Sequence, residues 1–278
     1  MLLYFLYNCL VLNFFIIMYT KEPLQMKKIF QKFISYFSKK FSTNFLGSKY
    51  GGWDFIETES LMNATIISAG VGTDVSFDIE IMQKYKTKVI FIDPTPTALD
   101  HLKLVLSSIG NHSTIPYSND GKQKINSYNL NNLKKENFII EKKALYNLNN
   151  KNIKFYQPIN LKHVSHSISN WQNNYSKNSA HIVVNTINLK NIIKKYKLQN
   201  IEMIKLDIEG AEFKVLLDLL RQKIKPKQIL VEFDELQTNK LINYLKYFFL
   251  ILKLFLGGYT MIETKKYPNF LFINRSNF

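Results

Sequence analysis

The stretch ATIISAGVGTDVSFDIEIMQKY, residues Ala64–Tyr85, decides the fold class of this chain. Its first part, Ala64–Gly70, is a short apolar run that ends in glycine, which is typical of a buried strand. Its second part, Asp74–Tyr85, has apolar side chains at helical spacing and an acid at its start, which indicates an α-helix. A buried strand that passes through a glycine turn into a helix favours an α/β domain with a parallel sheet.

The same alternation of strand and helix continues toward the C-terminus. Two polar stretches without periodicity, Asn111–Asn137 and Leu161–Ser179, are expected to be irregular. The remaining strands are predicted within Lys88–Asp93, Asn137–Tyr146, Asn152–Pro158, Ile201–Asp207, Lys227–Asp234, Tyr259–Lys266 and Asn269–Arg275. The remaining helices are predicted within Thr97–Gly110, Asn188–Tyr196, Ala211–Lys223 and Leu241–Leu256.

These patterns predict an α/β fold with a mostly parallel sheet, helices on both faces and a C-terminal antiparallel hairpin. In folds of this kind, ligands bind beyond the carboxyl ends of the strands, where the strand order reverses. Residues at the ends of the apolar strands are therefore the first candidates for a functional site.

Two segments precede the expected domain of residues 46–278. Residues 1–20 carry no charged side chain and are long enough to span a bilayer, and the lysines that follow would leave the remainder on the cytoplasmic side. A mis-assigned start codon explains this segment equally well. Residues 21–45 are expected to form a basic amphipathic helix or linker. Its apolar stripe suits either a membrane surface or docking on the domain, and it comprises Phe30, Phe33, Ile34, Phe37 and Phe41.

Composition limits the partners and the compartment. The single cysteine, Cys9, excludes a disulfide within the chain and favours a reducing, cytoplasmic compartment. The formal net charge is +16, but lysine and asparagine are spread through nearly every segment. A nucleic-acid-binding protein instead concentrates its basic residues on one helix or face, so we expect no nucleic-acid partner.

The turn after the first strand carries the features of a cofactor site. Gly70 and Gly72 allow a tight turn and a close approach to a ligand, and Asp93 ends the next strand about 20 residues further on, where it can accept both hydroxyls of a ribose. A dinucleotide fingerprint needs a third glycine, and Val75 stands at that position. Because Asp74 would also repel a pyrophosphate, a cofactor with a ribose and no phosphate fits better, such as S-adenosyl-L-methionine.

Five segments of the chain resemble the FkbM family of S-adenosylmethionine-dependent methyltransferases: LGSKYGGW, ISAGVGTDVSFDIEI, FIDPTP, HVSHSI and IKLDIEGAEFKVL with the downstream ILVEFDE. The resemblance runs from about Leu46 to the C-terminus. It implies a Rossmann-like methyltransferase fold with a seven-stranded sheet. It also implies O-methylation of sugar or polyketide hydroxyls, with Gly70, Gly72 and Asp93 binding the cofactor. The segment around Tyr50 and Gly51 is then expected to close over the methionine end.

A cluster of carboxylates at the turn MIKLDIEGAEFKVL, Met203–Leu216, is the second candidate site. We expect Asp207, at the end of its strand, to face the cofactor and to offset the positive charge of the sulfonium. Glu212 lies in the first helical turn, where an acid ordinarily caps free N–H groups. Glu209, together with His166, is our prediction for proton handling or substrate contact.

Further candidates lie in two other segments. His163 and Glu232 are assigned to the substrate side, and Asp234 is expected to terminate its strand. The two histidines of HVSHSI lack the context of a known zinc motif, and no metal is predicted.

The sequence as a whole favours a methyltransferase that transfers a methyl group to an oxygen of a carbohydrate, glycan or other small hydroxyl-bearing metabolite. Three alternatives stay open at this stage: an NAD-dependent oxidoreductase of the same architecture, a non-catalytic membrane-associated binding module, and an RNA methyltransferase. Val75 argues against the first, and the absence of a basic stripe with interleaved aromatic residues argues against the last.

Overall fold

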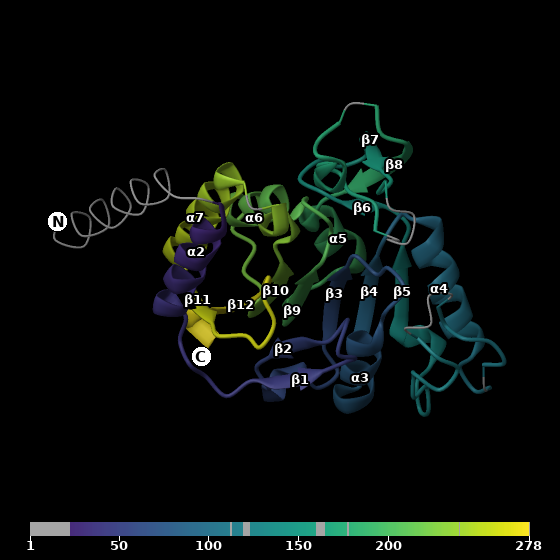
Figure 1. The fold of residues 1–278 in the computed structure, drawn as a ribbon. Helices are drawn as coiled ribbons and strands as arrows, with labels where there is room; N and C mark the ends of the chain where they lie inside the picture. Colours follow the sequence, from purple (N-terminus) through teal and green to yellow (C-terminus); the bar gives the residue numbers. More distant parts are fainter. Residues whose placement is uncertain are drawn as a thin grey trace.

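A seven-stranded sheet forms the centre of the computed structural model, which describes residues 23–111, 113–118, 123–159, 165–176, 178–238 and 240–277 (Figure 1). The strand order is β11-β12-β10-β9-β3-β4-β5. Only β12 runs antiparallel to its neighbours in this sheet. The strands are β3 Thr65–Ala69, β4 Lys88–Ile92, β5 Phe138–Glu141, β9 Met203–Leu206, β10 Gln228–Glu232, β11 Tyr259–Ile262 and β12 Asn269–Asn274. The predicted mostly parallel sheet with a C-terminal hairpin is confirmed.

Helices cover both faces of this sheet. One face carries α3 Ser76–Tyr85 and α4 Pro96–Ser107, and the other carries α2 Pro23–Phe37, α5 Leu189–Tyr196, α6 Glu212–Arg221 and α7 Leu241–Leu256. Single turns of 3-10 helix lie at η1 Glu59–Leu61, η2 Lys135–Asn137, η3 Trp171–Asn173, η4 Asp234–Thr238 and η5 Arg275–Asn277. The helix predicted to begin at Asp74 begins at Ser76 because the Asp74 carboxylate accepts a hydrogen bond from the Ser76 N–H (2.9 Å).

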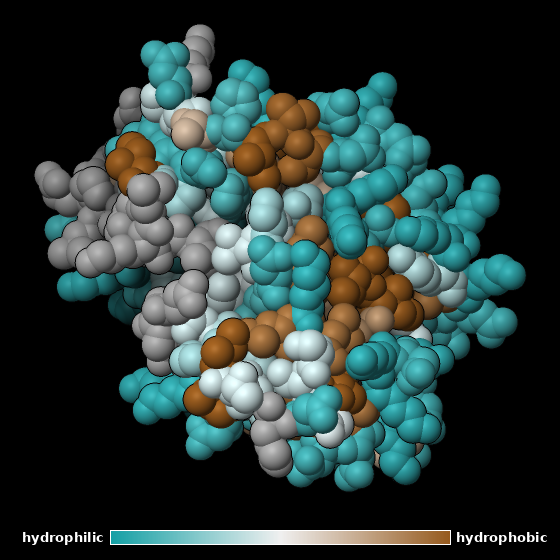
Figure 2. Space-filling view, turned by 90° about the vertical axis from the view of Figure 1, so that its right-hand side faces the viewer, coloured by the Kyte–Doolittle hydropathy of each residue, from teal (hydrophilic) through white to brown (hydrophobic). Residues whose placement is uncertain are grey.

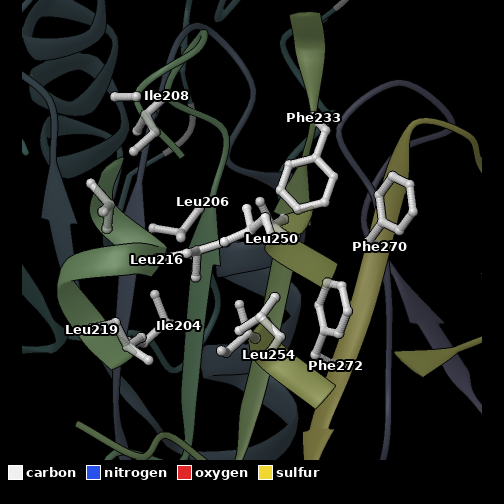
Figure 3. Close-up of a cluster of buried hydrophobic side chains, with 14 of the residues drawn as sticks. Ile204, Leu206, Ile208, Leu216, Leu219, Phe233, Leu250, Leu254, Phe270 and Phe272 are labelled. Carbon is white, nitrogen blue, oxygen red and sulfur yellow. The ribbon is translucent and has the colours of Figure 1, made fainter. Parts of the chain in front are cut away.

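The period of two along the central strands produces two separate apolar cores. In β3, Ile66 packs with the α3 and α4 side, whereas Ile67 packs with the α6 and α7 side. Figure 3 shows the second core, in which leucines of α6 and α7 meet apolar side chains of β9 and β12. Because both faces are buried, these strands read in sequence as nearly continuous apolar runs.

Two small sheets flank the main one. The hairpin of β1 Asn44–Leu46 and β2 Trp53–Phe55 lies on the α3 side, and a three-stranded sheet joins β6 Ala144–Leu145, β8 His181–Ile187 and β7 Asn152–Tyr156. Strand β8 is absent from our sequence predictions. Its β-branched residues Ile182, Val183, Val184, Thr186 and Ile187, interrupted only by Asn185, are the local signal that identifies it as a strand.

Helix α2 docks on the domain rather than standing apart from it. The Phe30 ring packs on Tyr244 of α7 at a centroid distance of 5.2 Å, and Phe33 packs on Phe248 at 4.6 Å. The two helices lie side by side in Figure 1. The predicted helical stripe is too long by one member, because α2 ends at Phe37 and Phe41 lies beyond it with an exposed side chain.

No helix among the described residues has the length and apolar character needed to cross a membrane. The expected membrane anchor of residues 1–20 lies outside the described residues. Figure 2 shows a face that is largely hydrophilic, with one larger apolar area near its centre and smaller apolar groups around it. This pattern fits the dispersed lysines and asparagines of the sequence.

A buried ion pair links the central strand β9 to helix α3. The Lys205 Nζ lies 3.1 Å from the Asp78 Oδ2 and 3.1 Å from the Ser68 Oγ. The Lys205 and Asp78 side chains are only 3% and 1% exposed. Removal of either partner would leave an uncompensated charge in the core, which typically costs about 3–5 kcal/mol.

We therefore expect the two substitutions Lys205→Met and Asp78→Asn to be strongly coupled. Each alone should lower the free energy of unfolding by about 3 kcal/mol or more, and the double variant should lose at least about 1 kcal/mol less than the sum. Urea denaturation measures all three variants. The exposed pair Lys103–Asp100 is the matched control, for which coupling should be near zero. Additive losses at the buried pair would contradict this prediction.

Candidate active site

A cavity of about 780 Å³ opens at the carboxyl ends of β3, β4, β9 and β10. This is the edge at which the strand order reverses, between β3 and β9, and its volume is in the range of small-molecule sites. Nine of the ten residues predicted for the site line it: Tyr50, Gly51, Gly70, Gly72, Asp93, His166, Asp207, Glu209 and Glu232. The tenth, His163, lies outside the described residues.

Gly70 is required by the contact between two strand ends. It has a φ of +80°, and a Cβ added to it would lie 1.6 Å from the Asp207 carbonyl oxygen. The Asp207 N–H donates to the Ala69 carbonyl at 3.0 Å, which fixes this close approach. From the sequence, Gly70 was expected to allow a tight turn and the approach of a ligand. The structure adds a packing reason, because the two turns of the site are in contact there, and the role of Gly70 toward a cofactor stays a prediction.

Gly72 faces open space, which makes it the glycine that leaves room for a ligand. It has a φ of +54°, and an added Cβ would meet nothing within 4 Å. The Asp93 Oδ2 accepts from the Val71 N–H (2.9 Å), and the Asp93 Oδ1 accepts from the Thr95 N–H (2.9 Å). Asp93 therefore holds the glycine turn. The Gly72 N–H and the Thr95 hydroxyl also donate to this carboxylate, and its role toward a ribose stays a prediction.

The segment before β2 is tied to the start of α3 at the mouth of the cavity. The Ser48 Oγ donates to the Asp74 Oδ2 at 2.6 Å and accepts from the Gly51 N–H at 2.9 Å. A Cβ on Gly51 would come within 2.6 Å of the Asp74 carboxylate. Tyr50 is 57% exposed, and its carbonyl accepts from the Lys266 ammonium. These contacts place Tyr50 and Gly51 beside the cavity, and their closure over the methionine end of a cofactor stays a prediction.

The buried Glu212 carboxylate stabilises the backbone of the acidic turn. Its side chain is fully buried, and its carboxylate accepts from the Ile208 N–H (2.9 Å) and the Gly210 N–H (2.8 Å). Burial raises the pKa of Glu212 well above its usual value, and hydrogen bonds from the backbone N–H groups of Glu212 itself and of Ile208 oppose that effect. The expectation that Glu212 satisfies backbone N–H groups at a helix start agrees with these contacts.

Glu209 occupies an unusual backbone conformation at the tip of the turn. Its φ is +54°, a region that a residue with a long side chain rarely adopts. The Ser167 Oγ donates to its carbonyl at 2.6 Å, and the Gln172 Nε2 donates to its Oε2 at 2.9 Å. Burial, together with the neighbouring Asp207 carboxylate, raises the pKa of Glu209 to about 7, although hydrogen bonds from Ser165 and Gln172 lower it.

Three carboxylates meet beside this turn. Asp207, Glu232 and Asp234 each place a carboxylate oxygen within 4.8 Å of the others. Burial, reinforced by Asp207, raises the pKa of Glu232 to about 8. Burial likewise raises the pKa of Asp207, against the positive charges of Lys205 and Lys266. Burial also raises the pKa of Asp234 well above its usual value. Asp234 follows the end of β10, as expected of a residue that terminates the strand, and it also lines the cavity, which was not predicted.

Residues of the 165–172 segment complete the other wall of the cavity. The His166 ring stacks on Phe155 of β7 at a centroid distance of 6.1 Å, and Trp171 and Gln172 line the cavity beside it. The sequence analysis found His166 but missed Phe155, Trp171 and Gln172. Their segment was predicted only as irregular, and no local pattern shows that it folds back on the acidic turn.

The fold and the cavity define the class of the protein. A mostly parallel sheet with the order β5-β4-β3-β9-β10-β12-β11, an antiparallel β12 and a cavity at the switch point form a Rossmann-like methyltransferase fold. Residues 64–256 match the model of the methyltransferase FkbM domain. The chain belongs to this family, as its resemblance indicated. No curated protein and no solved structure shows significant similarity to it.

Substitutions of the two glycines of the first turn should have different effects: one should mainly reduce stability, and the other should mainly affect ligand binding. Gly70→Ala should lower the free energy of unfolding by about 3 kcal/mol or more, because backbone strain adds to the overlap with the Asp207 carbonyl. Gly72→Ala should cost only about 1 kcal/mol for its backbone conformation while it narrows the cavity. Urea denaturation and calorimetric titration with S-adenosylhomocysteine measure the two effects. Equal stability of the two variants would contradict this assignment.

Proposed function

We propose that the protein transfers a methyl group from S-adenosyl-L-methionine to a hydroxyl oxygen of a carbohydrate, glycan or other small metabolite. The observation that carries this proposal is the meeting of the glycine turn and the acidic turn in one cavity at the switch point of the sheet. The first turn offers room and a carboxylate for an adenosine, and the second offers negative charge for a sulfonium.

The cofactor part of the proposal rests on the end of β4 and on the open side of Gly72. Asp93 stands where a ribose is bound in folds with this strand order, and Gly72 leaves the turn accessible. The Asp74 carboxylate faces the same cavity, which disfavours a pyrophosphate. These features support a cofactor that contains an adenosine and no phosphate.

The cofactor's positive charge matches the chemistry of the opposite wall. Asp207 and Glu209 line the cavity, and no lysine or arginine of the described residues lies within 4.0 Å of their carboxylates. A sulfonium and an ammonium group placed there would offset charges that otherwise repel one another. Asp207 is the residue that we assign to the methionine end.

The transfer itself is a displacement at the methyl carbon. The acceptor oxygen forms the new C–O bond, the C–S bond breaks with its electron pair on sulfur, and S-adenosylhomocysteine leaves. The hydroxyl proton passes to a nearby acceptor, for which we propose Glu209, with His166 on the acceptor side of the cavity. Positioning of the two reactants supplies much of the expected acceleration.

The proposed class of acceptor is supported by the family resemblance and by the residues that line the cavity. The wall of the 165–172 segment combines the aromatic Trp171 with polar side chains, which suits a hydroxyl-rich molecule. We propose a small-molecule or glycan partner and no nucleic acid. The N-terminal segment as a membrane tether, with the domain on the cytoplasmic side, belongs to the same proposal.

Calorimetry with two cofactors tests this function. The full-length protein should bind S-adenosylhomocysteine at one site per chain and should not bind NAD. The exposed variant Asp100→Asn, which lies on α4, should bind S-adenosylhomocysteine unchanged. Tight binding of NAD without binding of S-adenosylhomocysteine would instead establish an oxidoreductase of this architecture.

Glu209→Gln should separate proton handling from cofactor binding. Methyl transfer to a glycan and small-molecule extract, followed by mass spectrometry, should fall by about 10²–10⁴-fold, because an amide cannot accept the proton. Binding of S-adenosylhomocysteine should be retained. The control Glu136→Gln changes an exposed acid of η2 and should leave both unchanged. Full turnover by Glu209→Gln would exclude Glu209 as the proton acceptor.

A further inference from the structure

More carboxylates lie together at the ends of β9 and β10 than are needed to balance the single positive charge of a sulfonium. Asp207, Glu232 and Asp234 bring one carboxylate oxygen each within 4.8 Å of the other two. Glu209, although close, is not a member of this group. Three carboxylates so near one another repel strongly unless protons or a bound cation neutralise them.

Asp234 provides the independent observation. Its side chain is only 3% exposed, and its Oδ2 is buried without a hydrogen-bond partner among the described residues. An unpaired carboxylate oxygen in such a place ordinarily costs stability, and native structures rarely keep one without a purpose. This oxygen belongs to a residue that lines the cavity beside Asp207 and Glu232.

The two lysines near the three carboxylates do not place a positive charge among them. Lys205 also lines the cavity, but its ammonium is held by Asp78 and Ser68, and the Lys266 ammonium donates to the Tyr50 carbonyl. No salt bridge within 4.0 Å joins the three acids to a lysine or arginine of the described chain. The charge among them is therefore left for a ligand.

We propose that Asp207, Glu232 and Asp234 bind a hard divalent cation such as Mg²⁺ or Mn²⁺. The oxygen-only donor set is the one that these ions prefer. Ligand oxygens at about 2.0–2.1 Å from Mg²⁺ lie about 3 Å apart at neighbouring positions and about 4.2 Å apart across the ion, so the three carboxylates would draw together around the bound ion. Three carboxylates leave further coordination positions open to water and to an oxygen of the acceptor.

A role for this cation follows if the proposed methyl transfer is correct, and this part of the inference rests on that function. The ion would hold the acceptor oxygen at the strand ends beside the cofactor cavity and favour its deprotonated form. The three carboxylates would then balance the two charges of the cation and the one of the sulfonium. Cation binding itself does not depend on the nature of the acceptor.

Titration of the full-length, chelator-treated protein with Mn²⁺ tests the site, with free Mn²⁺ followed by electron paramagnetic resonance. We expect one Mn²⁺ per chain and a rise of the melting temperature with added Mn²⁺. Asp234→Asn should weaken binding by about tenfold or more. Without metal, the same variant should melt no lower than the wild-type protein, because one repelling charge has been removed. Asp100→Asn, at an exposed acid of α4, is the control and should bind Mn²⁺ as wild type does.

Two results would overturn the inference. One is wild-type protein that binds S-adenosylhomocysteine but no Mn²⁺, which would leave the proposed function intact. The other is unchanged Mn²⁺ affinity in Asp234→Asn and in Glu232→Gln. The second variant changes a partly exposed residue and keeps the test decisive if Asp234→Asn fails to fold. Mn²⁺ binding without S-adenosylhomocysteine binding would uphold the site and remove the proposed function instead.

Discussion

The contact between the ends of β3 and β9 is the constraint on which the site depends. Gly70 must lack a side chain because the Asp207 carbonyl lies where its Cβ would be, and the Asp207 N–H bonds to the Ala69 carbonyl. This contact joins the two turns that the sheet topology brings to its reversal point. A cavity with glycines on one wall and carboxylates on the other follows from it.

The carboxylates of the acidic turn have two kinds of role: Glu212 stabilises the backbone of the turn, whereas Asp207 and Glu209 face the cavity. Glu212 gives both oxygens to backbone N–H groups of the turn, and this fixes the chain on either side of Glu209. Glu209 is then held at a positive φ, with its carbonyl bound by Ser167 and its carboxylate by Gln172. Because these hydrogen bonds fix the backbone of the turn, the turn keeps its conformation while the Asp207 and Glu209 carboxylates face the cavity.

The sequence predicts the parts of this structure that repeat locally. The central strands are apolar runs and the helices have clear periodicity, so the sheet, its hairpin and nine lining residues could be predicted. Strand β8 was missed although its β-branched run is visible, which is a failure of interpretation. Trp171, Gln172 and the grouping of Asp234 with Asp207 could not be predicted. They depend on how an irregular segment folds back and on two strand ends that are 27 residues apart in the chain.

The basic composition of the chain does not offset these acids. Apart from the buried Lys205, which is paired with Asp78, most of its lysines are dispersed over the surface, where water and salt screen them, whereas Asp234 and Glu212 are buried. Carboxylates in such surroundings are either neutralised by protons or paired with a bound cation, and both outcomes depend on what the cavity holds. If the proposed cation or sulfonium binds there, it would relieve the repulsion between these carboxylates, and the liganded fold would be more stable than the unliganded one.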